Sequence, residues 1–265
     1  MSATLEGLTR ALAERDEPLI LFIRDDDAGW EQARLERLIA LCGAYRLPLD
    51  VAVIPAAVDR ACASALLAQR TVQPSHLGFH QHGWSHANHE PAGRPCEFGP
   101  SRSLDMIVSD IRAGQDKLQH LLGSAFDPIF TPPWNRCTPA TAAVLRDCGF
   151  TVLSRDATAI PAAIAGLVEC PTTLDWFAKR HGQRLAEAHW LACAADQLRR
   201  LPAVGLLLHH AVMDEREFSR LEALFAILAA SRACRPCALL SAAAQARVLS
   251  AASATTPMLA TEAGR

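Results

Sequence analysis

The chain has 265 residues, half of them hydrophobic, and its formal net charge at pH 7 is only −2. This length suits one large α/β barrel or two ordinary domains. Because the net charge is so small, we expect neither nucleic acid nor an anionic membrane as a partner. No apolar run reaches the roughly 18 residues of a membrane span, and charged residues interrupt the N-terminal segment where a signal peptide would be apolar.

The nine cysteines are scattered and odd in number, which argues against a disulfide framework. We therefore expect reduced thiols in a cytoplasmic protein. Cys234 and Cys237 form a CxxC pair, but two thiols alone cannot fill a tetrahedral metal site. A structural role is favoured for this pair.

Short apolar runs alternate with longer amphipathic stretches along the chain. The runs predict strands at residues 19–24, 49–54, 77–80, 128–131, 151–154 and 204–209. The stretches predict helices at residues 31–45, 56–69, 104–122, 139–148, 185–200 and 215–230. Strand and helix in alternation indicate parallel strands with crossover helices, and therefore an α/β sheet or barrel.

The pattern shows no linker, so we predict a single domain over residues 1–249. Residues 250–265 lack hydrophobic periodicity and are predicted to form a flexible tail. Residues 89–102 are rich in proline and glycine, and we interpret them as a loop beside the active site.

The first polar cluster is the run Arg24-Asp25-Asp26-Asp27, directly after an apolar strand. Parallel α/β folds place their active sites at strand ends of this kind. Three adjacent carboxylates repel one another, so a cation or hydrogen-bond donors must offset that repulsion. A solvated turn that caps a helix is the alternative interpretation.

The second cluster holds four histidines in ten residues, at 80–89. His82 and His86 stand four residues apart, so a helical turn or a tight loop brings both imidazoles to one face. A carboxylate from another strand can then complete a metal site with positions left for water and substrate. His80 and His89 are the alternative ligands.

Two further clusters follow later strands. Two prolines fix the backbone at residues 132–136, and Trp134 in this turn is expected to form a wall of a substrate groove. The apolar strand at 204–208 ends in His209 and His210. A histidine at such a place can act as a general acid, because its ordinary pKa lies near neutrality.

The order of these clusters resembles that of the NodB-like polysaccharide deacetylases, a superfamily of the carbohydrate esterase family 4 type. The resemblance covers about residues 19–238 and is carried by the signatures RDDDA, QHGWxHxNH, PPWN and GLLxHH. It implies that the predicted domain is catalytic and has the α/β fold of a distorted (β/α) barrel. It also implies a bound Zn²⁺ or another divalent metal, held by one aspartate and two histidines.

Carried over residue by residue, the resemblance implies that Asp27, His82 and His86 bind the metal. Asp26 then matches the general base and His209 the general acid.

Some assignments stay open or are secondary. A shift of one residue would make Asp25 the base and Asp26 the metal ligand. Asp175 matches the aspartate of the family's Asp-Trp motif, which orients the acid histidine. The residues expected to bind substrate are Trp84, Pro133 and Trp134.

The sequence departs from the family pattern at Thr131. Relatives usually have an arginine here, which pairs with the base. Arg24 lies two residues before Asp26 and therefore on the same face of the strand. We expect Arg24, or failing it Arg136, within hydrogen-bonding distance of a carboxylate in the run 25–27.

The resemblance implies a metal-dependent hydrolase that removes an acetyl or other acyl group from an N-acetylated substrate, with an acetylated carbohydrate as the first candidate. One alternative is a metal-dependent hydrolase of the C–N bond in a small non-carbohydrate amide. The other is a non-catalytic, metal-binding homologue. The sequence does not decide among these substrates.

Overall fold

A computed structural model describes residues 5–73 and 75–246; the tail predicted at 250–265 lies outside the described residues. This part of the chain is built on a curled parallel sheet with the order β6-β5-β4-β3-β2-β1-β10-β7, and β11 pairs with β1 beside it. The strands are β1 (Leu19–Ala28), β2 (Leu49–Val53), β3 (Leu77–His82), β4 (Phe126–Thr131), β5 (Val152–Leu153), β6 (Val168–Glu169), β7 (Leu174–Asp175), β10 (Ala203–Leu208) and β11 (Cys234–Pro236). A separate small hairpin pairs β8 (Lys179–Arg180) with β9 (Gln183–Arg184).

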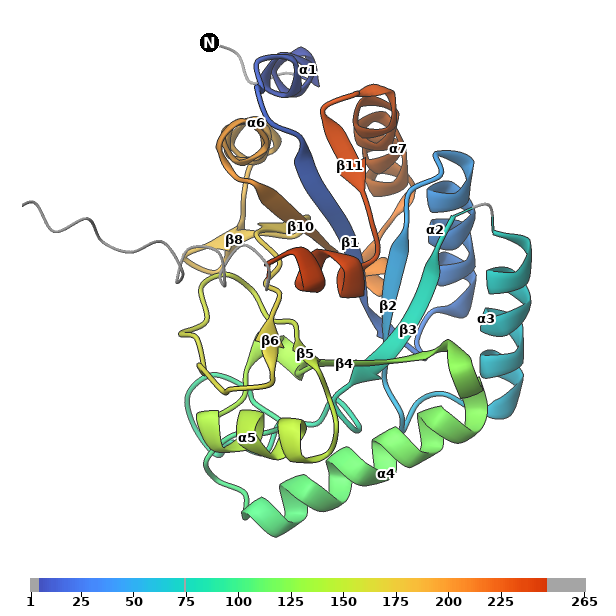
Figure 1. Ribbon diagram of the computed structural model, residues 1–265, viewed down its shortest axis with the longest axis vertical. Helices are drawn as coiled ribbons and strands as arrows, with labels where there is room; N and C mark the ends of the chain where they lie inside the picture. The colour runs from blue at the N-terminus through green and yellow to red at the C-terminus, as the bar shows by residue number, and fades with distance from the viewer. Residues whose placement is uncertain (1–4, 74, 247–265) are drawn as a thin grey trace, which may run out of the picture.

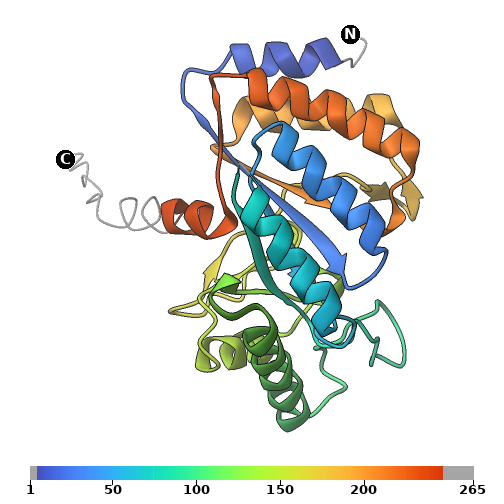
Figure 2. The same cartoon turned by 90° about the vertical axis from the view of Figure 1, so that its right-hand side faces the viewer.

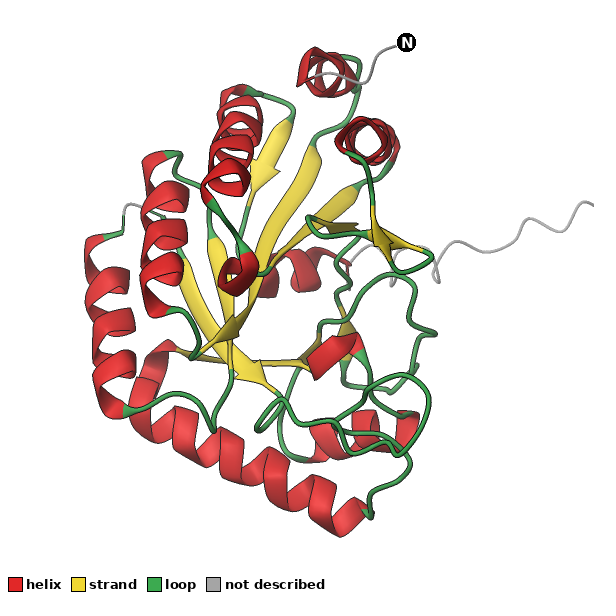
Figure 3. Ribbon diagram, turned by 180° about the vertical axis from the view of Figure 1, so that it is seen from behind, coloured by secondary structure: helices red, strands yellow, loops and turns green. Residues whose placement is uncertain are grey.

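Helices cover the outside of the curled sheet (Figures 1 and 3). They are α1 (Leu5–Ala13), α2 (Gln32–Ala44), α3 (Arg60–Val72), α4 (Leu104–Leu122), α5 (Pro139–Asp147), α6 (Glu187–Arg200) and α7 (Glu215–Ala230). Three short 3₁₀ turns are η1 (Gly123–Ala125), η2 (Pro133–Asn135) and η3 (His210–Val212). Figure 2 shows α2 and α3 side by side in front of the strands, with α1 and α7 above them. The predicted distorted (β/α) barrel is confirmed.

All six predicted strands and all six predicted helices are present, with small shifts at their ends. The first strand continues to Ala28 and the third to His82, so the polar residues that follow each apolar run still belong to the sheet. The third helix begins at Arg60 because the side chain of Asp59 accepts a hydrogen bond from the backbone N–H of Cys62 and caps it there.

The hydrophobic core lies on both faces of the sheet. The largest cluster joins the strands to the helices α1, α2, α3, α6 and α7. A smaller cluster brings Phe22, Ile129 and Val152 against Leu239, which opens a helical segment at residues 239–246. This segment also receives a polar contact, since Leu239 N–H donates to Asp50 Oδ2 at 2.8 Å.

All nine cysteines lie in the described part of the chain as free thiols. Among the helices that the structure describes, none is both long enough and apolar enough to cross a membrane.

Candidate metal centre

The carboxyl ends of β1, β3, β4 and β10 lie at the same edge of the sheet and carry the four polar clusters. The parallel register places Asp25 beside Leu208 on β10, and His82 beside Thr131 on β4. Residues that are far apart in the sequence therefore meet at one edge of the sheet, as expected for a parallel α/β fold.

Asp27, His82 and His86 form the centre of this edge. Asp27 Oδ1 lies 3.3 Å from Nε2 of His82 and 3.3 Å from Nε2 of His86. Zinc–ligand bonds of roughly 2.0–2.1 Å at tetrahedral angles would place ligand atoms about 3.3 Å apart. The donor set of one carboxylate and two imidazoles therefore fits a divalent cation of the zinc type.

The tautomer of His82 also suits metal binding. Its Nδ1 lies 3.0 Å from the carbonyl oxygen of Thr131, which can only accept, so Nδ1 carries the proton. In the neutral ring, Nε2 then carries the lone pair that a metal would use. A backbone carbonyl behind a metal-binding imidazole is a common way to fix the orientation of the ring.

Charges around the centre favour a cation. Burial alone would raise the pKa of Asp27, but hydrogen bonding to His82 and the charges of the nearby histidines lower it well below its ordinary value. Burial and the neighbouring His82 lower the pKa of His86, which favours the neutral imidazole that a metal needs. The pKa of His82 is raised despite its burial, because Asp26 and Asp27 both attract positive charge.

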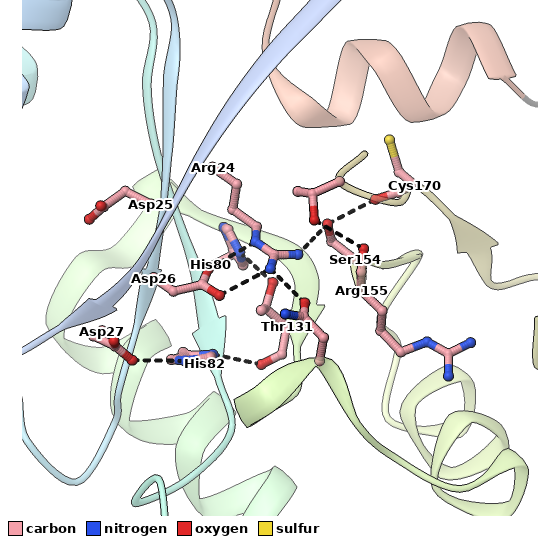
Figure 4. Close-up of polar contacts among 12 residues, drawn as sticks. Arg24, Asp25, Asp26, Asp27, His80, His82, Thr131, Ser154, Arg155 and Cys170 are labelled. Carbon is pink, nitrogen blue, oxygen red and sulfur yellow. Dashed lines mark hydrogen bonds and ion pairs between the residues drawn. The ribbon is translucent and has the colours of Figure 1, made fainter. Parts of the chain in front are cut away.

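The three consecutive aspartates have three different partners, of which Figure 4 shows Arg24 beside Asp26 and His82 beside Asp27. Asp25 points to the opposite side of β1, where its carboxylate accepts from the ring Nδ1 of His210 at 2.5 Å and from its backbone N–H at 2.9 Å. Asp26 pairs with Arg24, and Asp27 faces the two histidines. Because Asp25 faces away from His82 and His86, this geometry favours Asp26 and Asp27 over the pair shifted by one residue.

Arg24 makes the contact expected from its place on the strand. Its Nε and Nη2 donate to the two carboxylate oxygens of Asp26 at 2.8 and 3.0 Å. Nη1 and Nη2 also donate to Ser154 Oγ at 2.8 Å and to Asn135 Oδ1 at 2.7 Å. The side chain is fully buried, and the charge of Arg24 helps lower the pKa of Asp26 against the opposing effect of burial.

Arg136, the second candidate for this pairing, does not approach the aspartates. Its Nη1 donates instead to the carbonyl of Pro95 at 2.9 Å. Thr131, at the position of the missing family arginine, is hydrogen bonded through its hydroxyl to Nε2 of His80 at 2.9 Å. Arg24 therefore provides the positive charge beside Asp26 that was expected from an arginine at position 131.

The alternative ligands His80 and His89 do not join the centre. His80 is fully buried against Thr131, and burial together with Arg24 lowers its pKa to about 3. His89 is exposed in the following loop. The two rings therefore lie in different environments and share no ligand position.

Left-handed backbone conformations are concentrated at the centre. Asp27, His86, Trp134 and Asn135 have φ angles of 73°, 58°, 55° and 59°. Such angles are unfavourable for most residues other than glycine, and strain of this kind is often found at functional sites. The strained turn at 134–135 turns the Asn135 amide towards Arg24.

Glu97 organises the loop that carries His86, and it was not predicted, although it lies in a loop expected beside the site. Its buried carboxylate accepts from the backbone N–H groups of Trp84 and Ser85 at 3.2 and 2.7 Å, and from Ser85 Oγ at 3.0 Å. Gly83, with φ of 58°, leaves room for this carboxylate, since an added Cβ would lie 2.1 Å from Glu97 Oε2.

Two tryptophans flank His86, and only one of them was predicted. The rings of Trp134 and Trp30 lie 4.4 and 5.1 Å from the His86 ring, between centroids. Trp30 was not predicted, although an aromatic residue two positions after a strand end is a usable signal.

The role of Trp84 and Pro133 in substrate binding stays a prediction. Trp84 packs against the hydrophobic cluster around Phe98 and Phe130, and Pro133 is buried beside Gly83. Backbone strain in the turn presents Trp134 at the site while its neighbour Pro133 faces inward.

His209 lies close enough to lower the pKa of both Asp26 and Asp27. Its Nδ1 is buried and has no hydrogen-bond partner among the described residues. No hydrogen bond joins His209 to Asp175 among the described residues, and Asp175 Oδ1 accepts from the backbone N–H of Phe177 at 2.8 Å. The orienting role of Asp175 therefore stays a prediction.

No family model and no curated protein matches this sequence. Solved structures do match. A Mycobacterium smegmatis protein described as a polysaccharide deacetylase has a TM-score of 0.67 and 13% identity, over 89% of this chain and 92% of that one. A family 4 acetyl xylan esterase from Clostridium thermocellum, in complex with a cobalt ion, has a TM-score of 0.56 and 15% identity, over 84% and 89% of the two chains.

A third match is a mutant, with restored activity, of a carbohydrate esterase family 4 pseudoenzyme from Bacillus anthracis. It has a TM-score of 0.56 and 12% identity, over 85% of this chain and 67% of that one. At such identities the likeness concerns the fold and not the activity. The chain thus has the fold of the NodB-like polysaccharide deacetylases of carbohydrate esterase family 4.

Proposed function

We propose that the chain is a metal-dependent hydrolase that removes an acetyl group from an N-acetylated carbohydrate. The observation that carries this proposal is the convergence of Asp27 Oδ1 and the Nε2 atoms of His82 and His86, beside an Asp26 carboxylate that Arg24 holds in place. Acetyl removal by solved proteins of the same fold supports the choice of reaction.

Asp27, His82 and His86 would hold the metal. When bound, a divalent cation supplies Lewis acidity at the acyl oxygen and makes a water molecule more acidic. Asp26 would accept the proton from that water, acting as general base. Arg24 fixes both oxygens of Asp26 and keeps the carboxylate ionised, so that it neither turns away nor takes up a proton beforehand.

His209 would then donate a proton to the leaving amine. Its place at the end of β10, near Asp26 and Asp27, and the unpartnered Nδ1 support this role. The flat rings of Trp30 and Trp134 on either side of His86 would form the walls that receive the acetylated substrate.

The test combines metal analysis with acetate release from chitooligosaccharides and from acetylated small molecules. We expect the purified protein to contain a divalent metal at the site formed by Asp27, His82 and His86, which we call the first site. The variant His82→Ala should lose this metal. Asp26→Asn and His209→Ala should keep the fold and the metal while losing roughly two or more orders of magnitude in rate. The exposed His189→Gln is the matched control and should behave as the wild type.

Other outcomes would replace the proposal. Metal-dependent cleavage of small amides without activity on acetylated sugars would identify a C–N hydrolase of another class. Bound metal without any acetate release would identify a non-catalytic homologue. One neighbour in the structural comparison is itself a pseudoenzyme, so this fold does not guarantee activity.

A further inference from the structure

A second group of ligand atoms lies at the starts of the strands, away from the metal centre at their ends. Asp50 is near the start of β2, His76 directly precedes β3, and Asp127 is near the start of β4. At about 3.3 Å per residue, the six positions from His76 to His82 correspond to about 20 Å along the strand. The second group is therefore separate from the Asp27 centre.

Three atoms of this group converge. Asp50 Oδ1 lies 3.5 Å from Nε2 of His76, and Asp127 contributes a carboxylate oxygen, with all three atoms within 4.8 Å of one another. Asp50 Oδ1, His76 Nε2 and Asp127 Oδ2 are buried and have no hydrogen-bond partner within residues 5–73 and 75–246. Unpartnered buried polar atoms are costly, so three in one place require an explanation.

Asp50 is the clearest case, because it is fully buried. Its Oδ2 accepts the N–H of Leu239 at 2.8 Å, while Oδ1 is directed at His76 and Asp127 without a donor. A buried carboxylate that keeps one oxygen unpaired is suited to bind a cation with it.

Gly78 keeps the space between these atoms open. It lies beside Asp50 in the strand register. A Cβ added to Gly78 would lie 2.6 Å from His76 Nε2, 2.7 Å from Asp50 Oδ1 and 2.8 Å from Asp127 Oδ2. All three ligand atoms therefore surround one small space above this glycine, and any side chain there would fill it.

We propose that Asp50, His76 and Asp127 form a second divalent-cation site, which takes zinc or manganese and ties the starts of β2, β3 and β4 together. One imidazole and two carboxylates suit these ions better than Ca²⁺ or Mg²⁺, which prefer oxygen ligands alone. The His76 side chain is 33% exposed, so an ion can enter from solvent. Through Asp50, the site also supports the segment that begins at Leu239.

The site is structural rather than catalytic in this proposal. It lies at the ends of the strands opposite to the active-site edge, where residues of barrel folds serve stability. Binding should therefore raise the melting temperature of the folded protein, since an ion that binds only the native state stabilises it by mass action.

The test uses the full chain with His82→Ala and His86→Ala as a background, so that the first site cannot contribute. The metal-free protein is dialysed against Mn²⁺, which avoids thiolates, and separately against Zn²⁺, and the bound metal is measured by mass spectrometry. We expect the double variant with His82→Ala and His86→Ala to bind about one equivalent of metal. Its melting temperature should rise when the metal is bound.

Each of two additional substitutions should weaken this binding by at least about tenfold. Asp127→Asn removes a ligand charge, and Gly78→Ala keeps every ligand but fills the space among them. The matched controls are Asp147→Asn on the exposed end of α5 and Gly7→Ala, where an added Cβ meets no atom within 4 Å. Circular dichroism checks that each variant is folded.

Two results would overturn the proposal. A background protein that binds neither ion would mean that a proton on His76 alone balances the two carboxylates. Equal binding in the background, Asp127→Asn and Gly78→Ala would place the ion elsewhere, for example on the cysteines. Neither result bears on the first site, which the background already lacks.

Discussion

At the scale of single residues, Arg24 and Asp26 form a fully buried ion pair in which one guanidinium holds both carboxylate oxygens. Replacing Arg24 with Met would leave the Asp26 charge buried and unpaired. We expect this variant to lose about 3–5 kcal/mol of unfolding free energy, measured by chemical denaturation.

A double-mutant cycle with Asp26→Asn is the control for this prediction. The double variant removes both charges, so it should be more stable than the sum of the two single losses indicates, with a coupling energy above roughly 1 kcal/mol. Strictly additive losses would show that the pair does not act as a unit.

The pair of Asp25 and His210 predicts a dependence of stability on pH. Both ring nitrogens of His210 face acceptors, the Asp25 carboxylate and the Trp30 carbonyl. Burial would lower the pKa of His210, but Asp25 raises it to about 9. An unfolded histidine has a pKa of about 6.5, so the stabilisation is fully present below that pH and is lost as the pH rises towards 9.

The expected loss is on the order of 3 kcal/mol between these two pH values. It can be measured by denaturation at both ends of the range. Asp25→Asn removes the carboxylate that raises the pKa and should flatten the pH profile, whereas the exposed His189→Gln should leave it unchanged. The same slope in wild type and Asp25→Asn would refute the assignment.

The contact between Arg24 and Asp26 could be predicted because side chains alternate strictly between the two faces of a strand. The partner of Asp25 was not predicted, since His210 lies 185 residues later in the chain, in the turn η3 that follows β10. Glu97 was not predicted either, because a carboxylate in an irregular loop has no periodicity that would indicate where it points. Contacts of these kinds depend on the folded backbone.

At the scale of elements, the long helices and strands could be predicted because each has its own hydrophobic period. The two-residue strands β6 to β9 are too short to carry such a period and were not predicted. Helix α1 was not predicted, because Glu6 and Arg10 interrupt its short apolar pattern, although Leu5, Leu8 and Leu12 repeat at helical spacing. The sequence therefore predicts elements well where the pattern spans several turns.

The loop after β3 depends on Glu97 for its shape. Glu97→Ala would leave the N–H groups of Trp84 and Ser85 without their acceptor and free the segment that carries His86. We expect metal affinity at the first site to fall by roughly ten- to hundredfold, as for other residues that support ligands.

Equilibrium dialysis of the metal-free protein measures this change. Asp105→Asn, in the first turn of α4, is the control and should bind metal as the wild type does. Unchanged affinity in Glu97→Ala would show that His86 holds its position without the loop contacts.

At the scale of the whole molecule, the alternation of strands and helices was enough to predict the barrel class. The sequence did not predict how the inner face of the sheet is closed near Phe22 and Ile129. That role belongs to Leu239, which is fully buried although it follows the last strand. Two adjacent leucines, Leu239 and Leu240, in an alanine-rich stretch give too weak a pattern to assign the segment to the core.

We therefore expect Leu239→Ala to destabilise the fold by about 2–5 kcal/mol, as for other leucines removed from a core. Leu104, which is 49% exposed, provides the control, and Leu104→Ala should change stability little. Thermal and chemical denaturation of both variants measure the difference. Similar losses in the two variants would mean that the segment from Leu239 is not part of the cooperative core.

The separate partners of the three aspartates have a consequence for the evolution of this chain. Asp25, Asp26 and Asp27 would appear in an alignment as one uniform acidic block, yet each is constrained by a different contact. Position 25 should covary with position 210, position 26 with position 24, and position 27 with positions 82 and 86. A relative that has lost the histidine at 210 can therefore lose the first aspartate without loss of the other two.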